Sequence, residues 1–167
     1  MPSQTVVRPV RPEDYDAVAR ITRDAYLAAG HFDSADHPYM QQIQRVDERA
    51  AAATIWIAER EGQIVGSVTL ALEGEPYADI ARAAELEFRM LVVDPAVQRS
   101  GAGRAMVEAI LEYARTLPEI KTVALTTGLN WESAHVLYQR TGFERAPERD
   151  WFVPDTDIKL LVYTQSV

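Results

Sequence analysis

The sequence predicts an α/β domain, a sheet flanked by helices, because strand-like and helix-like segments alternate along the chain. An apolar run over 86–93 is followed by a glycine-containing loop, and apolar side chains then recur at helical spacing from Met106 to Leu117. Two further apolar runs, 54–60 and 64–72, flank Glu61-Gly62-Gln63, which is typical of a β-hairpin. The chain has 167 residues and is 47% hydrophobic, which suits one domain, over 1–167, with a sizeable core.

The remaining elements follow from local signals. Residues 5–10 predict a first strand, and Arg11-Pro12-Glu13-Asp14 opens a helix, with proline and acids in its first turn. We expect a second helix from residue 38 to about 52. Further along, the pattern predicts a strand at 122–127, a short helix after Asn130 and a closing strand at 158–164.

Composition narrows the chemistry. The chain contains no cysteine, which excludes disulfides, thiolate metal sites and an acyl-cysteine intermediate. Its formal net charge of −8 argues against a nucleic-acid surface. The first residues lack an apolar signal core, and no run approaches the length that spans a membrane. We therefore expect a cytoplasmic protein without membrane association.

The segment Gln98-Arg99-Ser100-Gly101-Ala102-Gly103-Arg104 lies between the 86–93 strand and the helix after it. The start of a helix presents backbone N–H groups without intrahelical partners, at the positive end of the helix dipole. Glycines let the main chain approach an anion closely, and two arginines add positive charge. The segment therefore predicts a phosphate or pyrophosphate site.

Two common phosphate motifs do not fit this loop. A dinucleotide fingerprint needs Gly or Ala three residues after Gly103, where the chain has Met106. A Walker A loop needs Lys followed by Ser or Thr after its last glycine, and Arg104-Ala105 does not supply it. The pattern Gln98-x-x-Gly101-x-Gly103 instead resembles the coenzyme A loop of the GNAT superfamily of N-acetyltransferases.

A second segment carries the same resemblance. The stretch from Asn130 to Gly142-Phe143 is similar to a second GNAT signature, with Leu137-Tyr138 inside it. Physically, Asn130 suits a helix N-cap and Gly142 suits the residue just after the helix. The order of the predicted elements also resembles that of GNAT proteins, which implies a mixed sheet flanked by helices.

The resemblance implies that acetyl-CoA or coenzyme A binds. In GNAT proteins the fourth strand splays from the fifth at a bulge, which leaves backbone N–H groups for the pantetheine arm and the acetyl carbonyl. The matching segment here is Leu91-Val92-Val93, and Asn130 is also expected to contact the coenzyme. The loop residues implied to hold the pyrophosphate are Gln98, Arg99, Ser100, Gly101, Ala102, Gly103 and Arg104.

Acyl transfer to an amine needs a group that deprotonates the amine and one that protonates the departing thiolate. Tyr138 matches the family tyrosine that acts as general acid. Glu87 stands where some members carry the carboxylate that deprotonates the amine, and Glu85 is the second candidate. Because Glu85, Glu87 and Arg89 alternate with apolar residues, we expect them on one strand face that borders solvent or a cleft.

Two other groups of residues are noted. His31, Asp33, Asp36 and His37 match no metal-ligand spacing, so we expect no metal and place this segment beside the acceptor or in a solvated loop. Trp151, Phe152 and Pro154 form an apolar cluster in a polar connection, which predicts either a homodimer contact or a wall of the acceptor pocket.

The resemblance implies an enzyme that moves an acetyl group from acetyl-CoA directly to a primary amine of a small molecule or peptide. The acceptor stays open among protein N-termini, polyamines, antibiotics and amino acids. One alternative is a non-catalytic acyl-CoA-binding module on the same fold, which would need neither acid nor base. The other is a different nucleotide-binding α/β protein.

Overall fold

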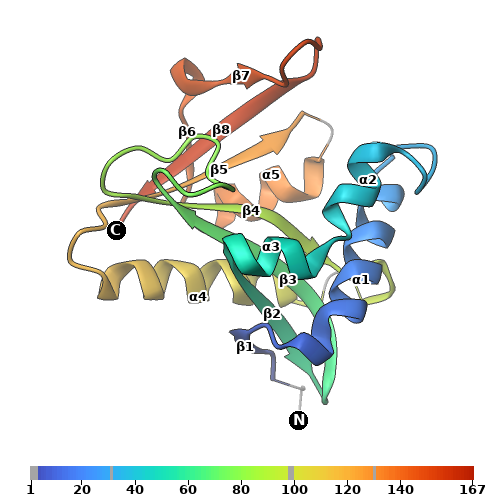
Figure 1. Cartoon of the computed structure of the whole chain (residues 1–167). Coiled ribbons are helices and arrows are strands. Elements are labelled where there is room, and N and C mark those ends of the chain that lie inside the picture. Colours follow the sequence, from blue (N-terminus) through green and yellow to red (C-terminus); the bar gives the residue numbers. More distant parts are fainter. Residues whose placement is uncertain (1–3, 31, 98–99, 130) are drawn as a thin grey trace.

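The computed structural model describes residues 4–30, 32–97, 100–129 and 131–167, and shows one sheet with helices on both faces (Figure 1). The helices are α1 (Tyr15–Ala28), α2 (Pro38–Ile43), α3 (Val46–Ala52), α4 (Ala102–Thr116) and α5 (Glu132–Arg140). The strands are β1 (Val6–Pro9), β2 (Thr54–Arg60), β3 (Gln63–Leu72), β4 (Glu85–Val93), β5 (Thr122–Gly128), β6 (Glu144–Arg145), β7 (Trp151–Phe152) and β8 (Lys159–Ser166).

The sheet is mixed, with the strand order β1-β2-β3-β4-β5-β8-β6, and β7 pairs with β8 outside this path. Every pair is antiparallel except β4 and β5, which run parallel. A parallel pair needs a crossover, and α4 provides it between β4 and β5. The predicted mixed sheet flanked by helices is therefore confirmed.

The two faces of the sheet carry different helices. On β2, Ile57 packs in a cluster with Val18 of α1 and Val46 of α3. The next residue, Ala58, belongs to the main core with buried residues of α4 such as Met106. Because successive strand residues point to opposite faces, α1 and α3 cover one face and α4 covers the other.

A bulge in β4 reverses which residues face α4. Met90 has a φ of 55°, and the register with β3 shifts between Ser67 and Thr69. Before the bulge, Phe88 belongs to the core on the α4 face; after it, Val93 packs against that core and Val92 packs with α1. Strict alternation along β4 therefore fails at Met90, as expected for one inserted residue.

Most element predictions are confirmed, with one correction. The hairpin turns at Glu61-Gly62, both with positive φ, and the buried face of α4 is the predicted one. The single helix expected over 38–52 is wrong: α2 ends at Ile43 and α3 begins at Val46. The break is stabilised by Arg49, whose Nη1 donates to the Ile43 carbonyl at 2.7 Å. The described helices include none long and apolar enough to cross a bilayer.

Candidate active site

Strands β4 and β5 separate part of the way along their length. Their parallel pairing runs from Glu85 with Thr122 to Phe88 with Leu125 and continues no further, although β4 extends to Val93 and β5 to Gly128. The separation begins two residues before the bulge at Met90. Along this stretch, one edge of β4 makes no hydrogen bonds to β5, so backbone donors and acceptors of that edge are left for a ligand.

Helix α4 begins at the mouth of this gap. Gly101 occupies its N-cap position with a φ of 85° and has no side chain with which to cap the helix. The first N–H groups of the helix are therefore left for an anion. Ser100 adds a buried Oγ without a hydrogen-bond partner in the described structure. Gln98, Arg99 and Asn130, which the sequence also proposes as coenzyme contacts, lie outside the described residues.

At Gly103, α4 lies close to β4 and α5. A Cβ at this position would lie 3.2 Å from Leu137 of α5, 3.7 Å from Val93 and 3.9 Å from Leu91. The sequence-predicted loop and the predicted strand segment Leu91-Val92-Val93 are thus brought together. Ala102, beside it, is buried, whereas the Arg104 side chain lies in solvent and pairs with Glu108 at 2.8 Å.

Tyr138 lies on α5 with its ring in the core. Its ring centroid is 5.8 Å from that of Phe88, 6.0 Å from Phe143 and 5.9 Å from Tyr163. The residue is only 5% exposed, and burial, aided by Tyr163, raises the pKa of its phenol well above the usual value. Gly142 follows α5 with a φ of 99°, as predicted for the residue after a helix. The Tyr138 phenol therefore stays protonated at neutral pH.

Glu87 is fully buried beneath the connection from β3 to β4. Its Oε1 accepts hydrogen bonds from the backbone N–H groups of Asp79, Ile80 and Ala81 at 2.9, 2.9 and 3.0 Å. Its Oε2 is buried and has no partner in the described structure. Burial raises the pKa of this carboxyl, although the N–H groups of Ile80 and Ala81 act to lower it.

The neighbouring charges on this face of β4 are paired. Arg149 contacts both oxygens of Glu85 at 2.8 and 2.9 Å. Arg89 contacts Asp79 at 3.0 Å and donates to the Tyr77 carbonyl. Burial acts to raise the pKa of Glu85, but the hydrogen bonds from Arg149 bring it below its usual range. The expected solvent-facing or cleft-facing strand side is instead covered by the 73–84 connection and by Arg149.

The candidate acid and base lie on opposite faces of the sheet. Phe88 packs against Tyr138 on the α4 face, and Glu87, next to it in the strand, points to the other face. The gap between β4 and β5 opens from Phe88 onward. Glu87 and the ring that packs on Tyr138 thus come from the last two paired residues of β4, directly before the gap opens.

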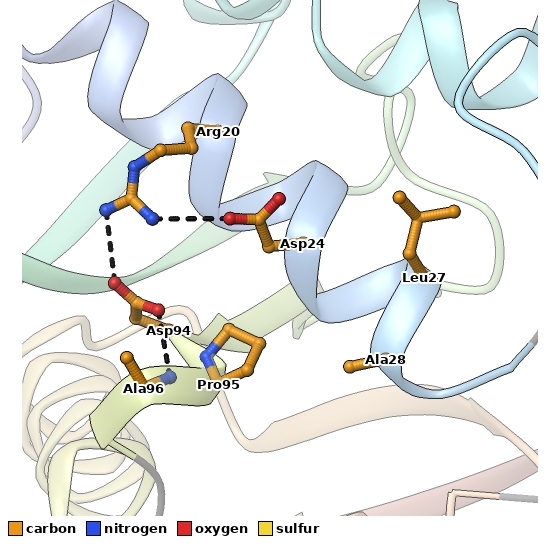
Figure 2. Close-up of a pocket in the computed structure, with 7 residues that line it drawn as sticks. All are labelled: Arg20, Asp24, Leu27, Ala28, Asp94, Pro95 and Ala96. Carbon is orange, nitrogen blue, oxygen red and sulfur yellow. Dashed lines mark hydrogen bonds and ion pairs between the residues drawn. The ribbon is translucent and has the colours of Figure 1, made fainter.

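An open cavity of about 440 Å³ lies beside this region (Figure 2). Leu27 and Ala28 of α1 form one wall, and residues 94–96, which follow β4, form the opposite wall. Arg20 joins the two walls by ion pairs with Asp24 at 3.3 Å and with Asp94 at 3.1 Å. Neither Glu87 nor Tyr138 lines this cavity, which flanks the end of β4 and is separate from the two candidate proton-transfer residues.

The structure also places the other residues that the sequence singled out. His37 caps α2 by accepting the N–H of Tyr39 at 3.1 Å, and its ring lies 4.7 Å from Phe32. Among the described residues, which leave out His31, no three histidine, aspartate or glutamate side chains gather as a metal site. His135 is packed, with its ring nitrogens hydrogen-bonded to Tyr163 and to the Gly128 carbonyl.

Sequence reasoning missed the backbone donors that hold Glu87. Residues 73–84 carry no strong helix or strand pattern. Every residue except proline has a backbone N–H, so the sequence does not show which of these groups bind Glu87. The pairing of Arg149 with Glu85 was missed for a related reason, since 64 positions separate the two residues.

Comparison with known proteins agrees with this geometry. The family model described as "Acetyltransferase (GNAT) domain" matches residues 51–145, more than half of the chain. A mycothiol acetyltransferase from Cellulomonas flavigena is 33% identical over 155 residues, which are 87% of this chain and 42% of that protein. The chain spans about half the length, or slightly less, of the curated relatives that it matches.

Solved structures share the fold. A GNAT-family acetyltransferase from Desulfovibrio desulfuricans superposes with a TM-score of 0.73 at 18% identity, over 98% of this chain and 99% of that one. An acetyltransferase from Salmonella typhimurium, solved with its cofactor acetyl-CoA, gives a TM-score of 0.68 at 17% identity, over 97% and 93% of the two chains. The family model covers more than half of the chain, and the start of α4 and the separation of β4 from β5 agree with it. The chain belongs to the GNAT family of acetyltransferases.

Proposed function

We propose that this chain is an acetyl-CoA-dependent N-acetyltransferase that transfers the acetyl group directly to a primary amine. The observation that carries the proposal is the gap that opens between β4 and β5 after Phe88 and Leu125, since the first turn of α4 packs at Gly103 against the part of β4 that borders it. A thioester cofactor with a long arm and a pyrophosphate fits these two features, because one offers an unpaired strand edge and the other an anion site.

The described residues fit the coenzyme on two counts. Among the described residues, no side chain caps the start of α4 and the buried Ser100 Oγ has no hydrogen-bond partner, so a phosphate oxygen could bind there. Gly103 keeps α4 close to Leu91 and Val93, so the strand edge and the helix start face one ligand. When bound there, acetyl-CoA supplies an activated acyl group on a sulfur leaving group.

Glu87 would accept the proton of the attacking amine. Its Oε1 is held by three backbone N–H groups, so the carboxylate is fixed and Oε2 is the oxygen that receives the proton. Burial raises the pKa of this carboxyl, which brings it closer to that of an ammonium group and makes Glu87 a stronger base. Glu85 is a poorer base because Arg149 occupies both of its oxygens.

Tyr138 would donate a proton to the departing thiolate. Burial keeps its phenol protonated, and its ring is fixed among Phe88, Phe143 and Tyr163. A positioned proton donor or acceptor contributes roughly 10²- to 10⁴-fold to the rate. In this proposal Tyr138 is the donor on one face of the sheet and Glu87 is the acceptor on the other.

A screen of binding and turnover tests the proposal. Acetyl-CoA should raise the thermal unfolding temperature of the chain, and a panel of primary amines should include acceptors that release free coenzyme A thiol. Binding without turnover of any amine would favour the non-catalytic acyl-CoA-binding module. Stabilisation by NAD or ATP in place of acetyl-CoA would reject both the enzyme and the binding module.

Further expectations accompany the proposal. A relative is named for mycothiol acetylation, but the acceptor of the present chain is proposed only as a small-molecule or peptide amine. The homodimer, the cytoplasmic location and the absence of nucleic-acid and membrane partners stay predictions. For the dimer, the β7–β8 hairpin is the proposed contact, since Phe152 is 55% exposed and Ile158 is 57% exposed on it.

A further inference from the structure

Arg49 of α3 is a buried cation, and two of its three side-chain nitrogens have no hydrogen-bond partner among the described residues. The residue is 1% exposed, and its Nη1 donates to the carbonyl of Ile43 at 2.7 Å. Within the described residues, its Nε and Nη2 are buried and have no hydrogen-bond partner. A buried guanidinium is costly unless its donors are satisfied, and burial accordingly lowers the pKa of Arg49.

Other arginines enclosed by this fold have a carboxylate partner within the chain. Arg8 contacts Asp14, Arg89 contacts Asp79, Arg145 contacts Asp150 and Arg149 contacts Glu85, at distances between 2.6 and 3.0 Å. Arg49 is more deeply buried than any of these four, yet no salt bridge to it is found among the described residues. Arg49 therefore differs from these four arginines in having no carboxylate partner among the described residues.

The two unpartnered donors have a specific geometry. Nε–H and one N–H of Nη2 lie parallel on the same edge of a guanidinium, and this edge matches the two oxygens of a carboxylate. Nη1, on the other side, is anchored to the carbonyl that ends α2. The side chain is thus held in place through Nη1, and the edge formed by Nε and Nη2 has the geometry to bind a carboxylate.

The surroundings of Arg49 place it on the same face of the sheet as Glu87. Its electrostatic neighbours are the phenols of Tyr26, Tyr77 and Tyr39 and the guanidinium of Arg89. Arg89 is bonded to Asp79, whose backbone N–H donates to Glu87. Arg49 and the candidate base therefore lie on the same face of the sheet, the one that α1 and α3 cover.

We propose that Arg49 binds a carboxylate of the acceptor, so that the substrate is an amine that carries a carboxylate group. This inference rests on the proposed acetyltransferase function and narrows its substrate class. The carboxylate would receive two parallel hydrogen bonds from Nε and Nη2, with tyrosine hydroxyls close by. The amine of the same molecule would then lie toward Glu87.

Matched substrate pairs test this directly. Release of coenzyme A thiol is measured with the common α-amino acids, β-alanine and γ-aminobutyrate, each beside its carboxamide, for the native chain and for Arg49→Met. The native chain should prefer at least one acid over its amide by roughly 10²-fold in kcat/KM, as expected for a buried charged pair. Arg49→Met should abolish the preference, so that an acid and its amide are acetylated with similar kcat/KM.

Two variants separate recognition from folding. Arg49→Lys should restore a smaller preference for the acid, because an ammonium keeps the charge without the parallel donors. Arg45→Met, at an exposed position four residues earlier, should behave like the native chain. Affinity for acetyl-CoA, measured by calorimetry, should be unchanged in all three variants.

The outcomes distinguish this inference from the function on which it rests. Equal or better turnover of the amides, or an equal loss with acid and amide in Arg49→Met, would overturn the carboxylate assignment and leave an acetyltransferase of another specificity. A native chain that binds acetyl-CoA and acetylates only amines without a carboxylate would also overturn it. Failure to bind acetyl-CoA at all would overturn the proposed function itself.

Discussion

Arg149 contacts both carboxylate oxygens of Glu85, at 2.8 and 2.9 Å, across 64 positions of sequence. The Arg149 side chain is 7% exposed and that of Glu85 is 12% exposed, so the pair is largely enclosed. A carboxylate held in this way is a structural ion and a weak proton acceptor. Two positions further along β4, Glu87 has an oxygen without a partner among the described residues, and this difference assigns different roles to two glutamates that look alike in the sequence.

Glu87→Gln should lower kcat by roughly 10²-fold while the fold is retained, because the amide oxygen can still accept the three backbone N–H groups. A base acts only when it is deprotonated, so the native rate should rise with pH through the raised pKa of Glu87. The variant should lack this rise. Initial rates measured across pH with saturating acetyl-CoA provide the check.

Glu85→Gln is the matched control for that experiment. It should keep the pH profile and instead lower stability by about 2 kcal/mol, because the charge of a largely buried Arg149 loses its partner. If Glu85→Gln removed the rise in rate with pH and Glu87→Gln did not, the two roles would have to be exchanged.

Tyr138→Phe should lower turnover by roughly 10²-fold and leave acetyl-CoA affinity unchanged, since the ring packing against Phe88 and Phe143 is retained. Tyr163→Phe removes a neighbouring phenol that hydrogen-bonds to His135 at 2.9 Å. It should cost about 1 kcal/mol of stability and little activity. A Tyr138→Phe variant as fast as the native chain would return Tyr138 to a purely structural role.

Asp150→Asn should destabilise the fold by about 2 kcal/mol at pH 7, because the carboxylate of Asp150 accepts from both Nη atoms of Arg145 and from the Val162 N–H. The Arg145 guanidinium holds the pKa of Asp150 below its usual range. The stabilisation is therefore present above the unfolded pKa, near 4, and is lost as pH falls through the lower folded pKa.

Urea unfolding of Asp150→Asn and of the exposed Asp157→Asn at several pH values checks this linkage. The difference between the native chain and Asp150→Asn should shrink on acidification below about pH 4, and Asp157→Asn should match the native chain throughout. A difference independent of pH would mean that the charge of Asp150 contributes nothing to stability.

Phe152→Ser should convert the proposed homodimer to a monomer without a large loss of stability, because the Phe152 side chain is mostly exposed on the β7–β8 hairpin. Light scattering over a wide concentration range measures the mass of both proteins. A monomer mass for the native chain at every concentration would reject the dimer. Trp151 is a poor choice for this test, since its indole N–H reaches Thr126 and the residue is partly buried.

The sequence predicted the elements because periodicity and turn chemistry are local. The turn at Glu61-Gly62 and the buried face of α4 follow from neighbouring residues alone. The split of the second helix could not be predicted in this way, since it involves the Arg49 side chain binding the carbonyl of Ile43 six positions earlier. Local patterns also did not predict β6 and β7, because each strand is only two residues long and is defined by its pairing with β8.

Candidate site residues could be proposed from the sequence only where they are side chains. Tyr138 and Glu87 were proposed from the family resemblance, and the structure places them on opposite faces of the sheet. The bulge at Met90 was expected only from resemblance, because the residues from 90 to 93 are all apolar and their pattern does not mark an inserted residue. The donors of residues 79–81 and the unpaired edge of Arg49 depend on backbone placement and burial, for which the sequence has no signal.

The coenzyme site at the start of α4 is tested most directly by calorimetric titration of acetyl-CoA into the native chain, Gly101→Asp and Gly74→Asp. Both glycines have a φ of 85°, and a Cβ added to either would meet no described atom within 4 Å, so the two substitutions impose the same backbone strain and the same charge. We predict one acetyl-CoA per chain, affinity strongly reduced in Gly101→Asp because the new carboxylate opposes the anion, and native affinity in Gly74→Asp. Equal affinity in all three proteins, or no binding by the native chain, would contradict the assignment of the coenzyme to this site.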